Sequence, residues 1–537
     1  MRRKFYHILC FCVLGIYFSS FSQQTSAIQI RMLSDQSVYI TGEEVWVDGY
    51  LSGDKTESKT IMLRLADRKG VTKTWTPLLI DQNQFSGIIN LPETLATDYY
   101  FLDAWILSGK TETLLVPLMV INPRMPFDKD CEANTANNGF IQNSEKFKID
   151  LSKNAIEKRE EIAITFSGEN KLALNQWSVI REDALSQLIN KNARIFNTTV
   201  AHAVPASLEK EGHVIGVRVR SEGKPLAGLK ILAALKGKKA IVGTATSDAN
   251  GIARFILPIN TGKTELSFTA ITNNSNSLVF ESLVEEVEAK PISFPCLLLQ
   301  EDMRADIEAR IFNSRVANKF QQDGIKYFAA LDMDSTDFYG KPDSRYLLDE
   351  FVRFPNMEEV IAEIIPDVRI KKEGNKTILQ SLNIPTRSFF NEEALILLDG
   401  TPLNKTKELL ESDPLLIRSI EVVSRKYSLG NLEFSGIVHF KTYKGDMGSF
   451  KNSTAEKNIS FLGVQETAIH QSPQFAKEKL PDFRNVIARD KNIRFDESGK
   501  STIKFKSSDA EGMYRVVFKG FYLDGTPIQV STSFQVQ

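Results

Sequence analysis

Cysteine and histidine are scarce in this sequence of 537 residues, which contains four Cys and five His. Four cysteines are too few for a disulfide-rich scaffold, and neither residue type shows the spacing of a zinc site. Glycine-rich phosphate-binding loops are also absent. The 66 Lys and Arg balance 67 Asp and Glu, so the chain lacks the basic excess of a nucleic-acid binder. We therefore expect no catalytic residue, no cofactor, no metal site and no nucleic-acid partner.

Hydrophobic runs are short except near the N-terminus. Residues 1–23 open with three basic residues, continue with a mostly apolar stretch over residues 5–18, and end in small and polar residues. This layout is typical of a cleaved signal peptide, and the apolar stretch is shorter than the ~20 residues that span a bilayer. We expect an exported chain with no integral membrane segment after signal removal. Of the four cysteines only Cys131 and Cys296 would remain, and whether they form a disulfide is left open.

Short runs of alternating apolar and polar residues, separated by Gly, Asp, Asn and Ser, fill most of the remaining sequence. Such runs, with turn signals about every 8–12 residues, predict antiparallel β-sandwiches. Residues 357–365 instead place apolar side chains on one helical face, and Pro366 then ends the helix. We predict a mainly β fold, with several antiparallel β-sandwich domains in series and one small α+β domain. The expected order is a signal peptide (1–23), a sandwich (26–123), a second β module (146–205), a third sandwich (206–290), a connecting segment (291–337), the α+β domain (338–445), a linker (446–479) and a C-terminal β segment (480–537).

The first sandwich carries a specific pattern in residues 35–45 (DQSVYITGEEV), 85–92 (FSGIINLP) and 99–104 (YYFLDA). This pattern resembles a macroglobulin-like domain of the alpha-2-macroglobulin superfamily, with Asp98 where that family usually has Gly. The second module and the C-terminal segment are similar to the same domain type. The third sandwich resembles the carboxypeptidase-regulatory type. The Cys-Gly-Glu-Gln thioester of the covalent-trap macroglobulins is absent from the sequence.

Four ordered motifs lie in residues 338–445: the helix followed by PDV, then LILLDGTPL (395–403), DPLLIRSIEVV (413–423) and FSGIVHFKTY (434–443). Together they resemble the plug domain of TonB-dependent outer-membrane receptors. The resemblance implies a small α+β plug fold without an active site. The receptors continue into a barrel of strands about ten residues long, and too few residues follow position 445 for such a barrel. Because no TonB-contact box is visible near the N-terminus, whether TonB is engaged is left open.

Several polar and aromatic groups were weighed as sites. The acidic run 332–337 begins like a calcium loop, but Asp337 stands where the loop needs Gly and Asp343 replaces the bidentate Glu, so a solvated loop is favoured. The adjacent pairs Glu43-Glu44 and Glu358-Glu359 are expected to be solvated surface, since neighbouring residues do not converge on one site. A glycan-binding platform would need exposed aromatic side chains, and strand Trp residues are more often core. The candidates for it are Trp46, Trp75, Trp105 and Trp177.

These features predict a non-enzymatic, exported cell-envelope protein that acts through protein–protein contacts at the outer membrane of a Gram-negative bacterium. The resemblance to a plug without its barrel implies docking on, or plugging, a separately encoded outer-membrane barrel. The alternative is a periplasmic or surface receptor for a polysaccharide or for a foreign protein, including a protease. The partner, the side of the membrane and the oligomeric state are left open.

Overall fold

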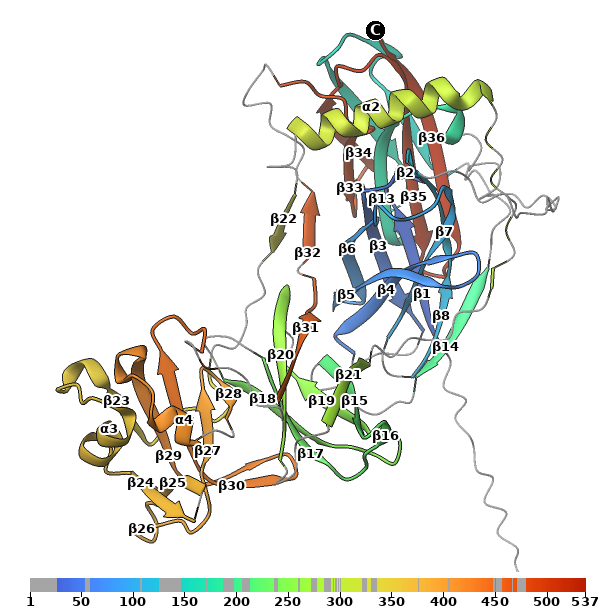
Figure 1. Cartoon of the computed structure of the whole chain (residues 1–537). Coiled ribbons are helices and arrows are strands. Elements are labelled where there is room, and N and C mark those ends of the chain that lie inside the picture. Colours follow the sequence, from blue (N-terminus) through green and yellow to red (C-terminus); the bar gives the residue numbers. More distant parts are fainter. Residues whose placement is uncertain are drawn as a thin grey trace, which may run out of the picture.

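The computed structural model arranges the chain in two lobes joined by several strands and connections (Figure 1). The structure describes residues 27–53, 58–106, 109–124, 146–169, 171–186, 198–204, 213–235, 240–258, 261–271, 278–283, 291, 292, 294, 297, 299, 301–320, 326–329, 336–374, 376–403, 406–447, 450, 456–465, 467–470 and 480–537. The expected signal peptide and the two remaining cysteines lie outside these residues. The prediction of a mainly β fold with several sheets is confirmed. No helix within the described ranges has both the length and the apolar character that a membrane span requires.

The first sandwich is a ten-stranded sheet folded around one apolar core, in the order β14-β8-β1-β3-β6-β5-β4-β7-β9-β2. Its β5–β6 hairpin has a two-residue loop, Gln82-Asn83, with both residues at positive φ, as the tightest hairpin turns require. Strand β14 lies in the expected second module, yet it pairs with β8 of the first sandwich. The strands are β1 (Ile28–Ser34), β2 (Val38–Ile40), β3 (Glu44–Ser52), β4 (Thr60–Asp67), β5 (Thr72–Asp81), β6 (Gln84–Asn90), β7 (Asp98–Trp105), β8 (Gly109–Leu114), β9 (Val116–Ile121) and β14 (Thr199–Val204).

The second sandwich combines the expected second module with the C-terminal segment. One sheet has the order β10-β12-β34 and the other β11-β36-β35-β13-β33, and both cover a shared aromatic core. Phe518 stacks on Phe147 with ring centroids 5.3 Å apart and lies 5.7 Å from Phe166. The strands are β10 (Lys148–Leu151), β11 (Ala155–Ile156), β12 (Glu161–Ser167), β13 (Leu172–Arg181), β33 (Val486–Lys491), β34 (Lys500–Lys506), β35 (Gly512–Tyr522) and β36 (Pro527–Val536).

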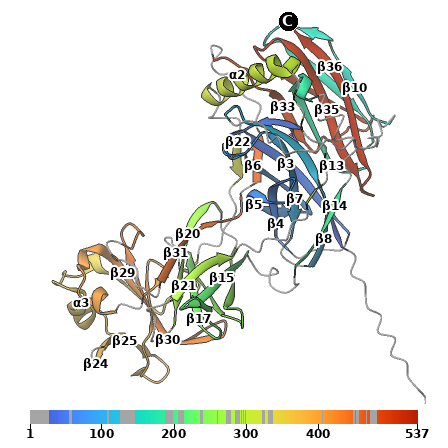
Figure 2. The same ribbon diagram turned by 45° about the vertical axis from the view of Figure 1, so that its right-hand side comes forward.

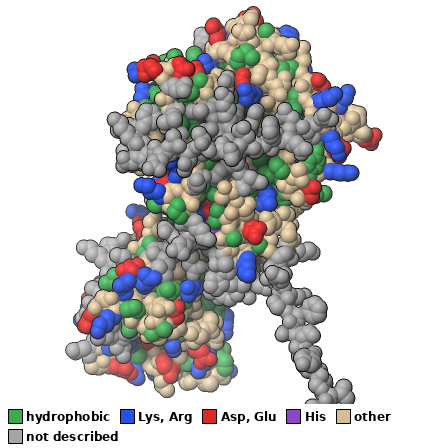
Figure 3. Space-filling model, turned by 90° about the vertical axis from the view of Figure 1, so that its right-hand side faces the viewer, with side chains coloured by type: hydrophobic (Ala, Val, Ile, Leu, Met, Phe, Trp, Pro, Cys, Tyr) green, Lys and Arg blue, Asp and Glu red, His purple; other side chains and the backbone are tan. Residues whose placement is uncertain are grey.

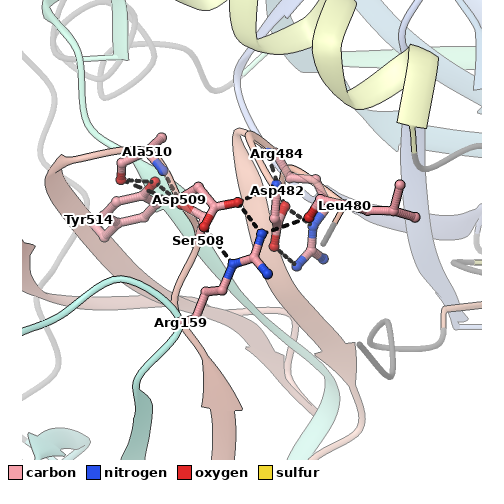
Figure 4. A network of polar contacts seen from close by, with 8 residues as sticks. All are labelled: Arg159, Leu480, Asp482, Arg484, Ser508, Asp509, Ala510 and Tyr514. Carbon is pink, nitrogen blue, oxygen red and sulfur yellow. Dashed lines mark hydrogen bonds and ion pairs between the residues drawn. The ribbon is translucent and has the colours of Figure 1, made fainter. Parts of the chain in front are cut away.

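A polar network joins Arg159, in the N-terminal part of this sandwich, to the C-terminal segment that completes it (Figure 4). The Arg159 guanidinium donates to both carboxylate oxygens of Asp509 at 2.6 Å, and to the Leu480 carbonyl at 2.7 Å. The same Asp509 carboxylate accepts the backbone N–H of Asp482 at 2.7 Å. Hydrogen bonding to Arg159 holds the pKa of Asp509 below its usual range. The network therefore joins segments that lie about 350 residues apart in the sequence.

A tyrosine closes a corner in each of these two sandwiches. The Tyr514 hydroxyl donates to the Ala510 carbonyl at 3.0 Å, and the Tyr100 hydroxyl donates to the Ala96 carbonyl at 3.0 Å. In both cases the acceptor lies four residues upstream. This is the tyrosine-corner arrangement of Greek-key sandwiches, so the two sandwiches share a local packing device.

The third sandwich forms the part of the lower lobe that contacts residues 336–447 (Figure 1). One sheet has the order β16-β15-β19 with β21 also pairing with β15, and the other has the order β18-β17-β20-β31. Gly251 ends the Asp-Ala-Asn-Gly turn of residues 248–251 and has a φ of 73°, the conformation that the turn needs. The strands are β15 (His213–Ser221), β16 (Lys224–Pro225), β17 (Lys230–Leu235), β18 (Ile241–Thr246), β19 (Ile252–Leu257), β20 (Lys263–Ala270), β21 (Leu278–Leu283) and β31 (Glu456–Leu462).

Residues 336–447 form a separate unit of helices and strands, which we call the α+β module. Its main sheet has the order β23-β29-β30-β27-β28, and a smaller sheet has the order β24-β25-β26. The predicted helix is present as α3 (Met357–Ile364), capped by the Asn356 side chain, which accepts the Glu359 N–H at 2.9 Å. The other elements are β23 (Ser344–Leu347), η2 (Leu348–Glu350), β24 (Val368–Glu373), β25 (Lys376–Asn383), β26 (Ser388–Phe389), β27 (Leu395–Leu398), β28 (Thr401–Pro402), α4 (Thr406–Leu410), η3 (Pro414–Leu416), β29 (Ile417–Leu429) and β30 (Leu432–Thr442).

Two glycines in the predicted motifs of this module have the conformations that only glycine adopts easily. Asp399 and Gly400 both have positive φ in the two-residue loop between β27 and β28. Gly436 has a φ of 88°, and a Cβ there would fall 2.8 Å from the Val423 carbonyl oxygen. It lies beside a register shift in the β29–β30 pairing, as the expected backbone bend requires.

The expected linker 446–479 contains strands, which differs from the prediction of a loop. Strand β31 completes the third sandwich, and β32 (Thr467–His470) pairs with β22 (Lys326–Ala329). Between these strands, the Gln465 side chain accepts the Ile88 N–H at 2.6 Å and donates to the Ile88 carbonyl at 2.9 Å. A Cβ at Gly87 would lie 2.7 Å from the Gln465 side-chain oxygen, so a larger residue there would displace the Gln465 side chain. The segment therefore connects the third sandwich to the first.

Helix α2 (Arg304–Phe320), preceded by η1 (Glu301–Met303), crosses the outside of the upper lobe in Figures 1 and 2. The helix buries Arg310, Asn313 and Ser314 against the lobe. A helix that faces its lobe with polar residues is positioned by hydrogen bonds and ion pairs in addition to apolar burial.

We predict that Phe518→Ala will destabilise both halves of the second sandwich together. Removing a buried Phe typically costs ~3–5 kcal/mol of folding free energy, because a cavity remains. Hydrogen exchange followed by mass spectrometry should show faster exchange in residues 148–181 as well as 486–536. Leu523→Ala is the control, because Leu523 is 72% exposed. Faster exchange in the C-terminal strands alone would contradict the shared core.

Candidate functional site

The α+β module contains a polar cluster at its contact with the third sandwich. Asp337, Glu421 and His439 bring their potential metal-ligating atoms within 4.8 Å of one another. Glu421 on β29 and His439 on β30 are directly opposite each other in the sheet, and Asp337 comes from the segment before β23. Directly opposite residues on paired strands point to the same face, which explains how these two side chains meet.

Hydrogen bonds fix the protonation states in this cluster. The Gly400 N–H donates to His439 Nε2 at 2.9 Å, so the neutral ring carries its proton on Nδ1, 2.6 Å from the Tyr339 hydroxyl oxygen. Tyr339 in turn donates to Glu421 at 2.7 Å. Burial, together with the Lys441 ammonium, lowers the pKa of His439 to about 3. Burial and the two carboxylates raise the pKa of Tyr339, which keeps its hydroxyl protonated.

Lys441 occupies the position that a bound cation would take. Its ammonium lies 2.8 Å from Asp337 and 3.0 Å from Glu421. Both His439 ring nitrogens are already engaged, and the Tyr339 hydroxyl is held as a donor. The residues of this cluster therefore do not fit a metal ion, and they offer neither an activated nucleophile nor a poised general base.

The cluster instead attaches the α+β module to the third sandwich. The second Asp337 carboxylate oxygen accepts the Ala240 N–H at 2.7 Å, and the Phe338 N–H donates to the Ala240 carbonyl at 2.9 Å. An apolar layer continues the contact, with Leu232 and Val242 of the sandwich against Leu397 of the module. The module is thus held by directional polar contacts as well as apolar burial.

The acidic side chains that the sequence analysis considered as candidate sites lie in separate parts of the structure. In the acidic run, residues 332–335 lie outside the described residues, and Asp337 is bound to Lys441 rather than solvated. Asp343 pairs with Arg425, away from the Asp337 ion pair. Glu43 is partly buried beside Arg310 of α2, so its assignment to solvated surface was wrong. Burial raises the pKa of Glu43.

The tryptophans do not form an aromatic platform. Trp105 and Trp177 are buried, and the Arg489 guanidinium lies over the Trp46 ring at 4.2 Å from its centroid. Trp75 is only partly exposed. These positions support the core interpretation of the strand tryptophans.

Large apolar side chains are exposed at one end of the α+β module. Val352 is 81% exposed and Leu415 is 62% exposed. We call this set the exposed tip, and its members are Phe351, Val352, Leu415, Leu416 and Tyr443. No pattern in the sequence distinguished these residues from the buried apolar residues beside them.

Arg353 holds the segments of the exposed tip together. Its guanidinium donates to the carbonyls of Pro414 and Ile417, at 2.8 and 3.0 Å, and to the Tyr443 hydroxyl oxygen at 2.7 Å. The three tip segments are therefore neighbours with a fixed geometry. A preorganised surface loses less entropy on binding than a mobile one.

Acidic and basic side chains are interspersed on the face of the lower lobe seen in Figure 3. Among the described residues visible on that face, charges of one sign form no extended region. An association there would depend on shape and apolar contact more than on a long-range field.

No family model and no curated protein matches the chain. Solved structures of bacterial alpha-2-macroglobulins are similar to it at low identity. The Salmonella protein reacted with methylamine is 9% identical, with a TM-score of 0.22, over 95% of this chain and 40% of that one. The native Escherichia coli protein is 10% identical, with a TM-score of 0.23, over 95% and 40%. This chain thus spans about two fifths of those proteins, and TM-scores this low do not establish a shared arrangement of domains.

We predict that His439 makes the α+β module less stable as the pH falls. The folded-state pKa of about 3 lies below the usual value of 6.5, so the unfolded chain binds a proton first. Stability is fully present above pH ~6.5 and decreases toward pH 3, by up to ~1.4 kcal/mol per pH unit for one proton. Pulse proteolysis in urea between pH 7 and 4 should show this slope, with cleavage sites in the module as the readout.

The matched variant for that experiment is His439→Gln, which removes the titrating ring. The other groups of the cluster are the same in both proteins, so the difference between the two slopes isolates His439. Equal slopes in the two proteins would show that the ring is not held neutral.

Proposed function

We propose that this chain is a non-enzymatic, exported cell-envelope protein that presents its α+β module to a protein partner in the outer membrane. The observation that carries the proposal is the exposed tip, where Val352 and Leu415 are largely exposed on a hydrogen-bonded frame. Contiguous exposed apolar side chains on a folded surface are typical of protein–protein contact sites. The four motifs that resemble a receptor plug support a barrel as the partner.

The contact between the α+β module and the third sandwich supports the same proposal. Asp337, held by Lys441 inside the module, and Phe338 bind the Ala240 backbone of the third sandwich, so the module has a defined position on its neighbour. The polar cluster offers neither an activated nucleophile nor a poised general base, which supports a non-enzymatic role. We therefore assign the module a docking role, with the sandwiches as the scaffold that positions it.

Site-specific photocrosslinking in cells tests the proposal. A photoreactive amino acid at position 352 should form an adduct that mass spectrometry identifies as an outer-membrane barrel protein. The same amino acid at Leu523, which is 72% exposed in the second sandwich, is the control and should give no such adduct. No barrel adduct at position 352, or equal adducts at both positions, would overturn the proposal. A protease adduct would favour the receptor alternative.

We predict that Val352→Asp and Leu415→Asp will each weaken binding to that partner by at least about tenfold. A charge in a desolvated contact costs ~1.4 kcal/mol or more of binding free energy. Binding of the purified full chain to the partner in detergent measures the effect. Val71→Asp, at a 53% exposed position in the first sandwich, should leave the affinity unchanged. An unchanged affinity in both tip variants would exclude the exposed tip from the contact.

A further inference from the structure

The sheet β18-β17-β20-β31 of the third sandwich has one face toward the core of that sandwich and the other toward the α+β module. On β20, Phe268 belongs to the core, so Ser267 and Thr269 on either side of it lie on the opposite face. There they are directly opposite Ala234 and Leu232 of β17. These two residues belong to the apolar layer that contacts the module, so the two hydroxyl groups share the face on which the module lies.

Polar groups on this face are buried without hydrogen-bond partners. Ser267 and Thr269 are 0% and 1% exposed, and neither hydroxyl has a partner among the described residues. Asn458 of β31 is directly opposite Ser267, and its side-chain oxygen is also unpaired within the described part of the chain. Thr401 of β28, the strand of the module that lies against β17, adds a fourth unpaired oxygen. Most buried polar groups in native structures are paired, so four orphans on adjoining elements need an explanation.

The hydrogen bonds between the described residues of the module and the sandwich lie at the other side of the sheet, on β18 and at its start. The Ala240 backbone is bound there, as described above. Thr244 Oγ1 donates to the Leu429 carbonyl at 3.1 Å. The Asn431 side-chain amide donates to Thr246 Oγ1 at 2.9 Å. Across the sheet, the contact thus changes from hydrogen bonds at β18, through the apolar layer at β17, to unpaired polar groups at β20 and β31.

This distribution makes the two sides of the contact energetically unequal. A hydroxyl that has lost water without gaining a partner opposes burial, whereas apolar residues and hydrogen-bonded groups favour it. If the module moved away from β20 and β31, water would satisfy the four unpaired groups, and the bonds on β18 would stay intact. Local opening has the lowest free energy where few favourable contacts are lost. The side of the contact at β20 and β31 is therefore the one that opens first.

We propose that the α+β module is hinged on the third sandwich: it pivots at β18 and opens away from β20 and β31. The pivot consists of the contacts at Ala240, Thr244 and Thr246, and the closed form is the one described above. Opening about a few strand-edge residues moves the exposed tip relative to the sandwiches without unfolding either unit. The hinge is independent of what the tip binds, so its test needs no partner and its failure would leave the docking role untouched.

Thiol labelling of the purified full chain tests the hinge. Thr269→Cys, Ala270→Cys and Ala240→Cys are each treated with N-ethylmaleimide, and peptide mass spectrometry gives the labelling rate at each position. Position 269 should react at least about tenfold faster than position 270, which is on the same strand but faces the core of the sandwich. Position 240, at the pivot, should react as slowly as position 270. Circular dichroism confirms that each variant is folded.

Two results of the labelling experiment would overturn the proposal. Equal rates at positions 269 and 270 would mean that only global unfolding exposes either thiol, so the contact would not open locally. Equal rates at positions 269 and 240, both above the rate at position 270, would mean that the module detaches as a whole and that β18 is not a pivot.

A second variant tests whether the unpaired hydroxyl groups promote the opening. Thr269→Val keeps the shape of the side chain and removes the hydroxyl, so the closed form should become more favourable. Labelling of Ser267→Cys should therefore slow by at least about threefold when Thr269→Val is added. Thr502→Val, at an exposed position in the second sandwich, is the control and should leave the rate unchanged. Unchanged or faster labelling with Thr269→Val would count against the proposal, because the hydroxyl would then not oppose the closed form.

Discussion

The antiparallel pairing of β13 with β35 and β33 is the constraint on which the rest of the structure depends. It joins Trp177 to Phe518 and to Asp490, so a strand from the first third of the chain completes its sheet with the last residues. The entropy of closing so large a loop grows only slowly with length, by ~0.6 kcal/mol for each doubling. The aromatic core around Phe518 and the Arg159–Asp509 pair are thus sufficient to hold the ends together.

Because the second sandwich closes on itself, the third sandwich and the α+β module form an insertion whose two ends are fixed. After β14 the chain leaves the upper lobe for the third sandwich and returns to it at α2. It leaves again for the α+β module and comes back through β31 and β32 before β33. The Gln465 side-chain amide makes two hydrogen bonds with the Ile88 backbone, as a neighbouring strand would. These bonds hold the segment between β31 and β32 against the first sandwich. The insertion is therefore tethered at more than its ends.

Local rules identified the features of this chain that depend on a few neighbouring residues. The helix before Pro366, the Asp399-Gly400 loop and the bend at Gly436 follow from spacing and backbone preference, and the structure has all three. Pairings over long distances have no local signal, so β14 was expected in another module and residues 456–470 in a linker. The same applies to the candidate sites. Lys441 and Arg353 are unremarkable in sequence, and only the fold places them in their clusters.

Buried ion pairs lie at two of the contacts between units of this molecule. Asp48 pairs with Arg489 between the first two sandwiches, and Asp183 of the second sandwich pairs with Arg310 of α2. Such pairs add little net stability, since desolvation offsets most of the attraction, but they penalise every arrangement that separates them. We infer that they specify how the units are oriented.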